Sequence, residues 1–161
     1  HIESLEIDFD LDKLSFEEIV SVFWKNHNPI SPFWKRQYAK AIFFHNEKQK
    51  KIILNSKQKL EKELKEQITT EIIPYERFYQ AENYHQKYHL QNHTALLADF
   101  KKIFTNMQQF VDSTASARVN GYINGYGTAI NFDKDIERLG LEQSSVDILK
   151  HQYFEYKKKA V

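Results

Sequence analysis

The sequence contains no cysteine. This absence excludes disulfide bonds, zinc sites with cysteine ligands and any thiol nucleophile within the 161 residues. Glycine and proline are also scarce, with 4 and 3 residues, so the loops that depend on them are confined to the few places where they gather.

Long apolar runs and an excess of one charge sign are missing as well. No stretch approaches the roughly 18 consecutive apolar residues of a membrane helix, and no secretory signal segment is recognisable. The 23 basic and 22 acidic side chains leave a formal net charge of +1, so no overall field attracts nucleic acid or an anionic membrane. We therefore expect a cytoplasmic protein with no nucleic-acid partner and no membrane partner.

Apolar material is nevertheless sufficient for a folded core. Hydrophobic residues make up 41% of the sequence and aromatic residues 14%, which argues against disorder. The length is that of about one domain. The sequence begins with His1 and already shows a strand-like pattern there, so we expect that it starts in the middle of a fold.

The first half of the sequence alternates strand and helix patterns. In residues 3–10 apolar and acidic residues alternate with a period of two, which predicts a half-buried strand. Residues 39–45 and 68–74 are apolar or β-branched runs and predict two more strands. Between the three strands, Ser15 starts a helix through a capping box, and Asn46 caps a longer one.

The second half of the sequence has mainly helical spacing. Residues 94–111 and 144–158 predict helices, and residues 119–132, with three of the glycines, predict turns or a loop. The fold class expected is therefore α/β (α+β), with a mixed sheet and flanking helices in residues 1–93. Residues 94–161 are expected to form a mainly helical extension packed on that core.

The run Phe78–His93 is crowded with histidines and aromatic residues. On a helix, His85, His89 and His93 would lie along one face, and a pair four residues apart can share a zinc ion. The HExxH pattern is absent and the remaining ligands are missing, so we expect no metal site. Histidines that cap, form hydrogen bonds or face water are the alternative.

Five segments in order resemble the peptide methionine sulfoxide reductase type A family, in an extended form found in some animals. These segments are HIESLEIDFD, SFEEIVSVFWKNHNP, RQYAKAIFF, TTEI and FYQAENYHQKY. The resemblance covers residues 1–93 and implies a peptide-methionine (S)-S-oxide reductase without a cofactor, active in protein repair after oxidative stress. Its substrate would be methionine sulfoxide in proteins or peptides, and thioredoxin or another thiol would be the reductant.

The resemblance also implies roles for individual residues. The start HIE is similar to the family segment whose glutamate protonates the sulfoxide oxygen, which implies that Glu3 is a general acid. The segment RQY is similar to one whose tyrosine binds the same oxygen, which implies that role for Tyr38. The remaining residues implied for the pocket or its surroundings are Gln37, Glu82, Tyr84 and His85.

These residue types suit the chemistry. A thiolate that attacks a sulfoxide sulfur needs a protonated oxygen, and a carboxylic acid kept neutral in an apolar site can supply that proton. A phenol hydroxyl adds a positioned donor to the same oxygen. Considered without the resemblance, Glu3 fits an exposed strand residue and Tyr38 fits a core tyrosine with a bonded hydroxyl.

The sequence departs from the family pattern at the nucleophile. The family cysteine lies in a Gly-Cys-Phe-Trp segment upstream of the position that His1 matches, and no such segment occurs here. We expect the 161-residue chain alone to be inactive. The alternatives are a non-catalytic relative that binds oxidised methionine or a protein partner, and an interaction role for the C-terminal helices.

Overall fold

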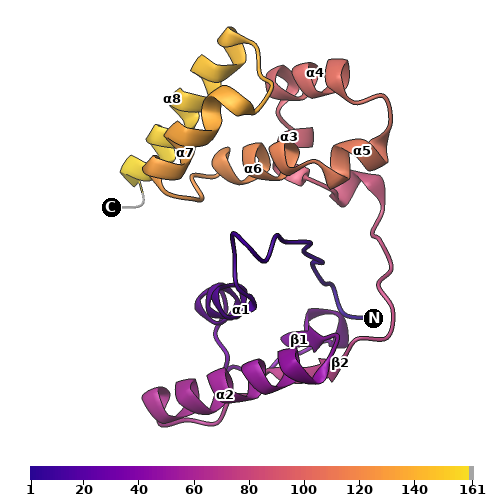
Figure 1. Cartoon of the computed structure of the whole chain (residues 1–161), viewed down its shortest axis with the longest axis vertical. Coiled ribbons are helices and arrows are strands. Elements are labelled where there is room, and N and C mark those ends of the chain that lie inside the picture. Colours follow the sequence, from indigo (N-terminus) through magenta and orange to yellow (C-terminus); the bar gives the residue numbers. More distant parts are fainter. Residues whose placement is uncertain (160–161) are drawn as a thin grey trace. The chain divides into compact units, whose positions relative to one another are not determined.

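The computed structural model describes residues 1–159, which form two compact units. The first comprises His1–Tyr79 and the second begins at Gln80 (Figure 1). The predicted α/β class is confirmed, because a small parallel sheet occurs together with helices and a C-terminal helix. The division of the chain after His93 stays a prediction, and Ala160 and Val161 lie outside the described residues.

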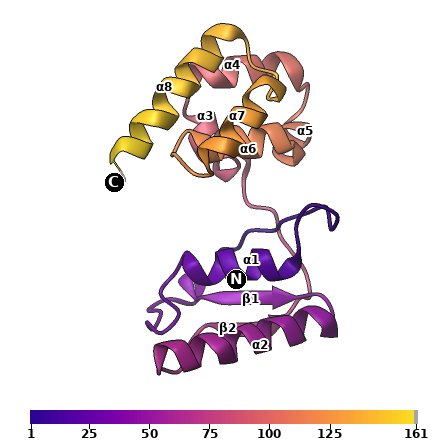
Figure 2. The same ribbon diagram turned by 60° about the vertical axis from the view of Figure 1, so that its left-hand side comes forward.

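The first unit is built on a two-stranded parallel sheet. Strand β1 pairs with β2 so that Ala41 lies opposite Glu71 and Phe44 opposite Pro74, and the helix α2 forms the connection between them (Figure 2). The elements of this unit are α1 (Phe16–Lys25), η1 (Arg36–Tyr38), β1 (Ala41–Phe44), α2 (Glu47–Leu64) and β2 (Glu71–Pro74).

Both helices of the first unit start as predicted. The Ser15 hydroxyl accepts from the Glu18 N–H, and the Glu18 carboxylate accepts from the Ser15 N–H, which completes the capping box. The Asn46 side chain accepts from the Gln49 N–H at the start of α2. These bonds satisfy N–H groups that have no partner within the helix.

The core of the first unit lies between its two helices and one face of the sheet. Val20 and Trp24 of α1 are buried together with Ile53 of α2 and Ile68 before β2. The Trp24 indole Nε1–H donates to the Ser56 hydroxyl at 2.9 Å, so the polar atom of this large side chain is satisfied. The half-buried sheet residues packed against this core are Ile42, Phe44 and Ile72.

The prediction of a strand over residues 3–10 is wrong, because this segment has no regular secondary structure. Leu5 and Ile7 are 81% and 50% exposed. A strand requires a neighbouring strand to pair with its N–H and C=O groups. The one backbone bond that holds residues 1–9 joins the Glu3 N–H to the Gln37 carbonyl. The segment therefore has the period-two apolar pattern of a strand but no neighbouring strand with which to pair.

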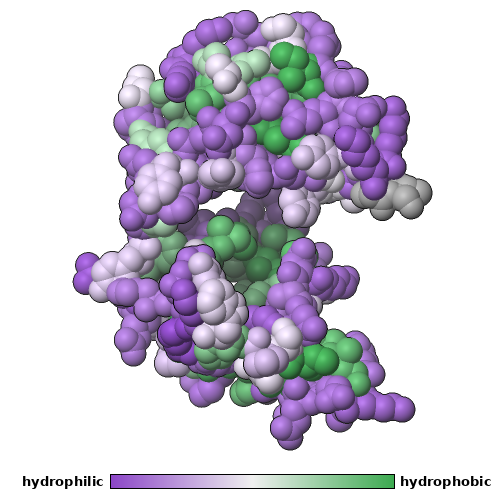
Figure 3. Space-filling model, turned by 180° about the vertical axis from the view of Figure 1, so that it is seen from behind, coloured by the Kyte–Doolittle hydropathy of each residue, from purple (hydrophilic) through white to green (hydrophobic). Residues whose placement is uncertain are grey.

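The second unit is helical. Its elements are η2 (Asn83–His85), α3 (Tyr88–Gln91), α4 (Thr94–Ile103), α5 (Met107–Asp112), α6 (Thr114–Tyr122), α7 (Ala129–Asp135), η3 (Ile136–Arg138) and α8 (Gln143–Lys159). Its core contains Leu96, Phe132 and Tyr153, each fully buried. The Phe132 and Tyr153 rings stack with their centroids 4.2 Å apart. The surface around this core is mostly hydrophilic and is interrupted by apolar patches (Figure 3).

Two helix boundaries of the second unit differ from the prediction. The helix predicted over residues 94–111 is divided, because Asn106 caps a new helix through its bond from the Gln109 N–H. The loop predicted over residues 119–132 is shorter, since α6 continues to Tyr122. Gly125 has a positive φ of 69°, and a Cβ there would lie 2.8 Å from the Cβ of Tyr156. Glycine is needed at this one close approach to α8.

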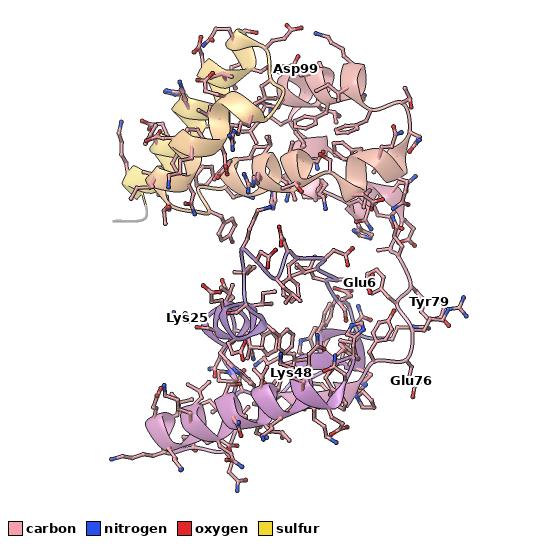
Figure 4. All side chains as sticks on the ribbon, viewed as in Figure 1. Glu6, Lys25, Lys48, Glu76, Tyr79 and Asp99 are labelled. Atoms are coloured by element: carbon pink, nitrogen blue, oxygen red, sulfur yellow. The ribbon has the colours of Figure 1, made fainter. Side chains whose placement is uncertain are left out.

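Asp99 ties α4 to the start of α8 from a buried position (Figure 4). Its carboxylate accepts from the Glu142 N–H at 3.0 Å and from the Lys102 ammonium at 3.4 Å. Burial alone would raise the pKa of Asp99, but hydrogen bonds from Ser145, Glu142 and Lys102 outweigh it and lower the pKa. The charged form of Asp99 is therefore favoured in the folded state.

Replacement of this carboxylate is expected to destabilise the second unit in a pH-dependent way. Asp99→Asn should lower the free energy of unfolding by about 2 kcal/mol at neutral pH, because charged hydrogen bonds are lost. The folded pKa lies below the unfolded one, so the contribution of Asp99 is present above the unfolded pKa and lost as pH falls through the folded pKa. The difference between variant and parent in urea unfolding should shrink towards acid pH.

The exposed Glu137→Gln serves as the control for this prediction and should change stability little at any pH. A difference for Asp99→Asn that stays constant down to acid pH would show that the carboxylate charge has no part in the effect.

Ser116 is fully buried in α6, and its hydroxyl has no hydrogen-bond partner among the described residues. We expect Ser116→Ala to raise the free energy of unfolding by about 1 kcal/mol, because an unpaired buried hydroxyl is removed. Its neighbour Ser113 caps the same helix by accepting from the Ser116 N–H at 3.2 Å. Ser113→Ala should lower stability by about 1 kcal/mol. Thermal unfolding measures both, and two changes of the same sign would contradict this assignment.

Candidate functional site

Glu3 and Gln37 hold the first residues of the chain beside η1. The Glu3 N–H donates to the Gln37 carbonyl at 2.9 Å, and the Gln37 side-chain Nε2 donates to Glu3 Oε1 at 3.3 Å. These residues are 34 positions apart in the sequence, yet one backbone bond and one side-chain bond connect them. Glu3 is therefore bonded to the residue that directly precedes Tyr38 in η1.

Tyr38 presents its ring at the surface of the first unit. It is 45% exposed, and its ring centroid lies 5.5 Å from that of Trp34, which is 76% exposed. The Lys35 ammonium lies 4.7 Å from the centroid of the Trp34 ring. Among the residues that the structure describes, no group bonds to the Tyr38 hydroxyl, so this hydroxyl is free to donate to a bound oxygen.

An ion pair fixes the turn that carries Tyr38. The Arg36 guanidinium lies 2.5 Å from a Glu71 carboxylate oxygen at the start of β2. This contact joins η1 to the start of β2. Sequence analysis missed the contact, since Glu71 lies 35 residues away and no local pattern marks the pair.

His27 is a second residue that sequence analysis did not single out. Its Nδ1–H donates to the Phe23 carbonyl at 2.8 Å, so its Nε2 accepts from the Thr70 hydroxyl at 2.9 Å. Burial lowers the pKa of His27 and favours the neutral ring that these bonds require. Its function is to join the end of α1 to the segment before β2, and it takes no part in the proposed chemistry.

The three remaining predicted residues lie together in the second unit. The Nε2 atom of His85 is 3.8 Å from a carboxylate oxygen of Glu82, and the ring centroids of Tyr84 and His85 are 4.2 Å apart. Tyr84 is 63% exposed, and all three residues belong to or adjoin the single turn η2. The single helix on which His85, His89 and His93 would share a face is not formed, because Lys87, with a positive φ of 46°, separates η2 from α3.

The histidines of this run do not share one helix face. His93 caps α4, since its Nδ1 accepts from the Leu96 N–H at 3.5 Å while its Nε2–H donates to the Gln152 side-chain oxygen at 2.9 Å. This arrangement confirms the alternative of a capping, hydrogen-bonded histidine. Over residues 1–159, histidine, aspartate and glutamate form no cluster of three or more that could hold a metal ion. Within residues 1–159, none of the helices is long and apolar enough to cross a membrane.

Comparison with known proteins gives a consistent result. A family model described as peptide methionine sulfoxide reductase matches residues 1–119. A peptide methionine sulfoxide reductase of Drosophila melanogaster is 41% identical over 143 residues, which are 88% of this chain and 57% of the relative. The enzyme named MsrA of Methanosarcina acetivorans is 42% identical over 114 residues, which are 63% of this chain and 59% of that protein.

A plant relative extends the comparison. Peptide methionine sulfoxide reductase A2 of Arabidopsis thaliana is 34% identical over 93 residues, covering 55% of this chain and 43% of the plant protein. The chain thus spans about half the length of the curated relatives that it matches. The matched part includes Glu3, Tyr38 and His85, since all three lie within residues 1–119.

Proposed function

The chain belongs to the peptide methionine sulfoxide reductase family, and from this we propose that it supplies the acid and the oxygen-binding groups of a peptide-methionine (S)-S-oxide reductase. The observation that carries the proposal is the turn at which Gln37 bonds to Glu3 and Tyr38 follows with an unpaired hydroxyl. Gln37 is the positioning residue, since its amide fixes the carboxyl group. The roles that the resemblance implies for Glu82, Tyr84 and His85 stay predictions.

The proposed reaction transfers one oxygen atom. A cysteine thiolate attacks the sulfoxide sulfur, Glu3 donates a proton to the sulfoxide oxygen, and the Tyr38 hydroxyl donates a hydrogen bond to the same atom. The oxygen passes to the cysteine as a sulfenic acid, and methionine is released. A second thiol then forms a disulfide with that sulfur and releases water, and thioredoxin or another thiol reduces the disulfide. We propose the cytoplasm as the compartment, where such thiols are kept reduced.

The nucleophile has to come from outside these residues, because none of the 161 is a cysteine. The family pattern has its cysteine in a Gly-Cys-Phe-Trp segment ahead of the position of His1. We propose that a polypeptide that carries such a segment before His1 is the active form. The 161-residue chain alone should then give no turnover.

Turnover of a peptide containing methionine (S)-sulfoxide, with dithiothreitol as reductant, tests this proposal. The 161-residue chain is compared with a chain extended by a cysteine-bearing segment, and with the same extension carrying serine in place of that cysteine. We expect activity only in the cysteine form. Activity in the unextended chain would contradict the thiol mechanism, and inactivity of a folded cysteine form would contradict the assignment of the acid and the phenol.

The absence of cysteine from the 161 residues also favours a second function. A relative that keeps Glu3 and Tyr38 without a thiol could bind oxidised methionine or a protein partner and leave it unreduced. Calorimetric titration of the 161-residue chain with the sulfoxide peptide measures this binding. Tyr38→Phe, which removes one hydroxyl, is the matched control and should weaken it. A folded chain that releases no heat would rule out this alternative.

A further inference from the structure

Helix α8 has a buried face and an exposed face. Val146, Leu149 and Tyr153 lie in the core of the second unit. Ile148 lies on the exposed side and is 39% exposed, and Tyr156, which borders the buried side and packs beside Gly125, is 45% exposed. They line an open groove along the helix. Single apolar side chains are common on protein surfaces, so these two gain meaning only from the pattern of ionisable groups around them.

The ionisable residues of this groove form a row at intervals of four. Asp147, His151, Glu155 and Lys159 follow one another along the same face, each one helical turn after the last. We use the name α8 face for these four residues together with Ile148 and Tyr156. The row runs from an acidic group at its start to a basic group at its end, so its two ends carry opposite charges.

This order of charges is complementary to itself when reversed. Asp147 and Lys159 lie equally far from Tyr153 along the helix, on opposite sides of it, and so do His151 and Glu155. An antiparallel copy of α8 would therefore place Lys159 opposite Asp147 and Glu155 opposite His151. From this symmetry we propose that the α8 face is an interface with a second copy of this chain, arranged about a two-fold axis that crosses the exposed side of α8 at the level of Tyr153.

The groups of the α8 face keep bonding capacity for such a contact. Asp147 accepts from the Gln143 side chain at 2.9 Å, and Glu155 accepts from Lys158 at 2.9 Å, but a carboxylate can accept several bonds. The pKa of the Glu155 carboxyl is lowered mainly by its hydrogen bond from Lys158 and also by the charge of Lys159, so Lys159 already has an electrostatic partner on its own helix. In an antiparallel pair the Lys159 ammonium would gain a second carboxylate, that of Asp147 in the other copy.

The apolar part of the α8 face fits the same arrangement. In an antiparallel pair, Ile148 of one copy comes to lie beside Tyr156 of the other, and the reverse contact occurs by symmetry. Each contact would remove an aliphatic and an aromatic side chain from water. The apolar contacts would supply affinity, and the charged row would fix the antiparallel direction.

The size of the surface sets the expected strength. A helix segment of this length extends only about 20 Å, whereas a stable complex buries about 800 Å² on each partner. A single helix face is smaller than this. The dimer should therefore be weak, and it should dissociate on dilution.

Sedimentation equilibrium of the 161-residue chain over a wide concentration range tests the proposal. We expect a monomer–dimer equilibrium. Asp147→Lys and Lys159→Asp should each weaken the dimer at least about tenfold, because each creates two like-charged contacts across the axis. The double variant that carries both changes should recover the parent affinity, since the charges are exchanged and not removed.

Two controls separate this contact from other effects. Lys101→Glu reverses an exposed lysine of α4 and should leave the dimer unchanged. Circular dichroism checks that every variant keeps its helical content. A chain that stays monomeric at all concentrations would overturn the proposal, and so would a dimer that neither single charge reversal weakens or that the double reversal does not restore.

Discussion

Replacement of Glu3 by glutamine in the cysteine-bearing polypeptide is expected to lower the rate of sulfoxide reduction by about 10²- to 10⁴-fold. Glutamine keeps the oxygen that accepts from the Gln37 amide at 3.3 Å, so the turn should stay intact. It has no proton to donate, and the sulfoxide oxygen would leave unprotonated. Single-turnover measurements at saturating substrate separate this loss from a loss of binding.

The control for this prediction lies in the same segment. Glu6 is an exposed carboxylate a few residues away, and Glu6→Gln should leave the rate within about twofold of the parent. A rate for Glu3→Gln that is equally close to the parent would mean that another group protonates the oxygen. Tyr38 would then be the next candidate, because its phenol is unpaired.

Phe132→Ala is expected to have the largest effect on the stability of the second unit. Phe132 is fully buried, stacks on Tyr153 at 4.2 Å and contacts the Tyr122 ring edge to face at 5.0 Å. Removal of the ring loses its transfer free energy and leaves a cavity, so unfolding should become easier by about 3–5 kcal/mol. Urea unfolding followed by far-ultraviolet circular dichroism measures the change.

Phe154→Ala is the matched comparison for Phe132. Its ring lies 5.8 Å from that of Phe132, but it is 40% exposed and should cost only about 1 kcal/mol. Equal losses for the two variants would mean that the aromatic stack does not carry the stability of this unit. A small loss for Phe132→Ala alone would show that the surrounding helices collapse into the space.

Helix starts could be predicted from sequence because their signals are local. Ser15 and Glu18 lie within one turn of each other, and Asn46 adjoins the helix that it caps, so no distant residue decides these starts. The strand expected over residues 3–10 failed for the opposite reason. Its apolar pattern is local, but its hydrogen bonds would have to come from a neighbouring strand.

In the candidate site, too, the local features could be predicted from sequence and the contacts between distant residues could not. The resemblance located Glu3 and Tyr38, and the structure adds how Gln37 and the pairing of Arg36 with Glu71 hold them. Those contacts join residues that are more than 30 positions apart, and a single sequence carries no signal for them. The assignment of the site to Glu3 and Tyr38 stays a prediction until their variants are measured.

Mass spectrometry of the natural polypeptide tests the central claim most directly. The protein is isolated from its source and incubated with a methionine (S)-sulfoxide peptide in the absence of reductant, and its intact mass is compared before and after. We predict a cysteine beyond these 161 residues that becomes oxidised as one equivalent of methionine forms. A natural polypeptide without cysteine, or one whose cysteine stays reduced while no methionine appears, would contradict the proposed reductase.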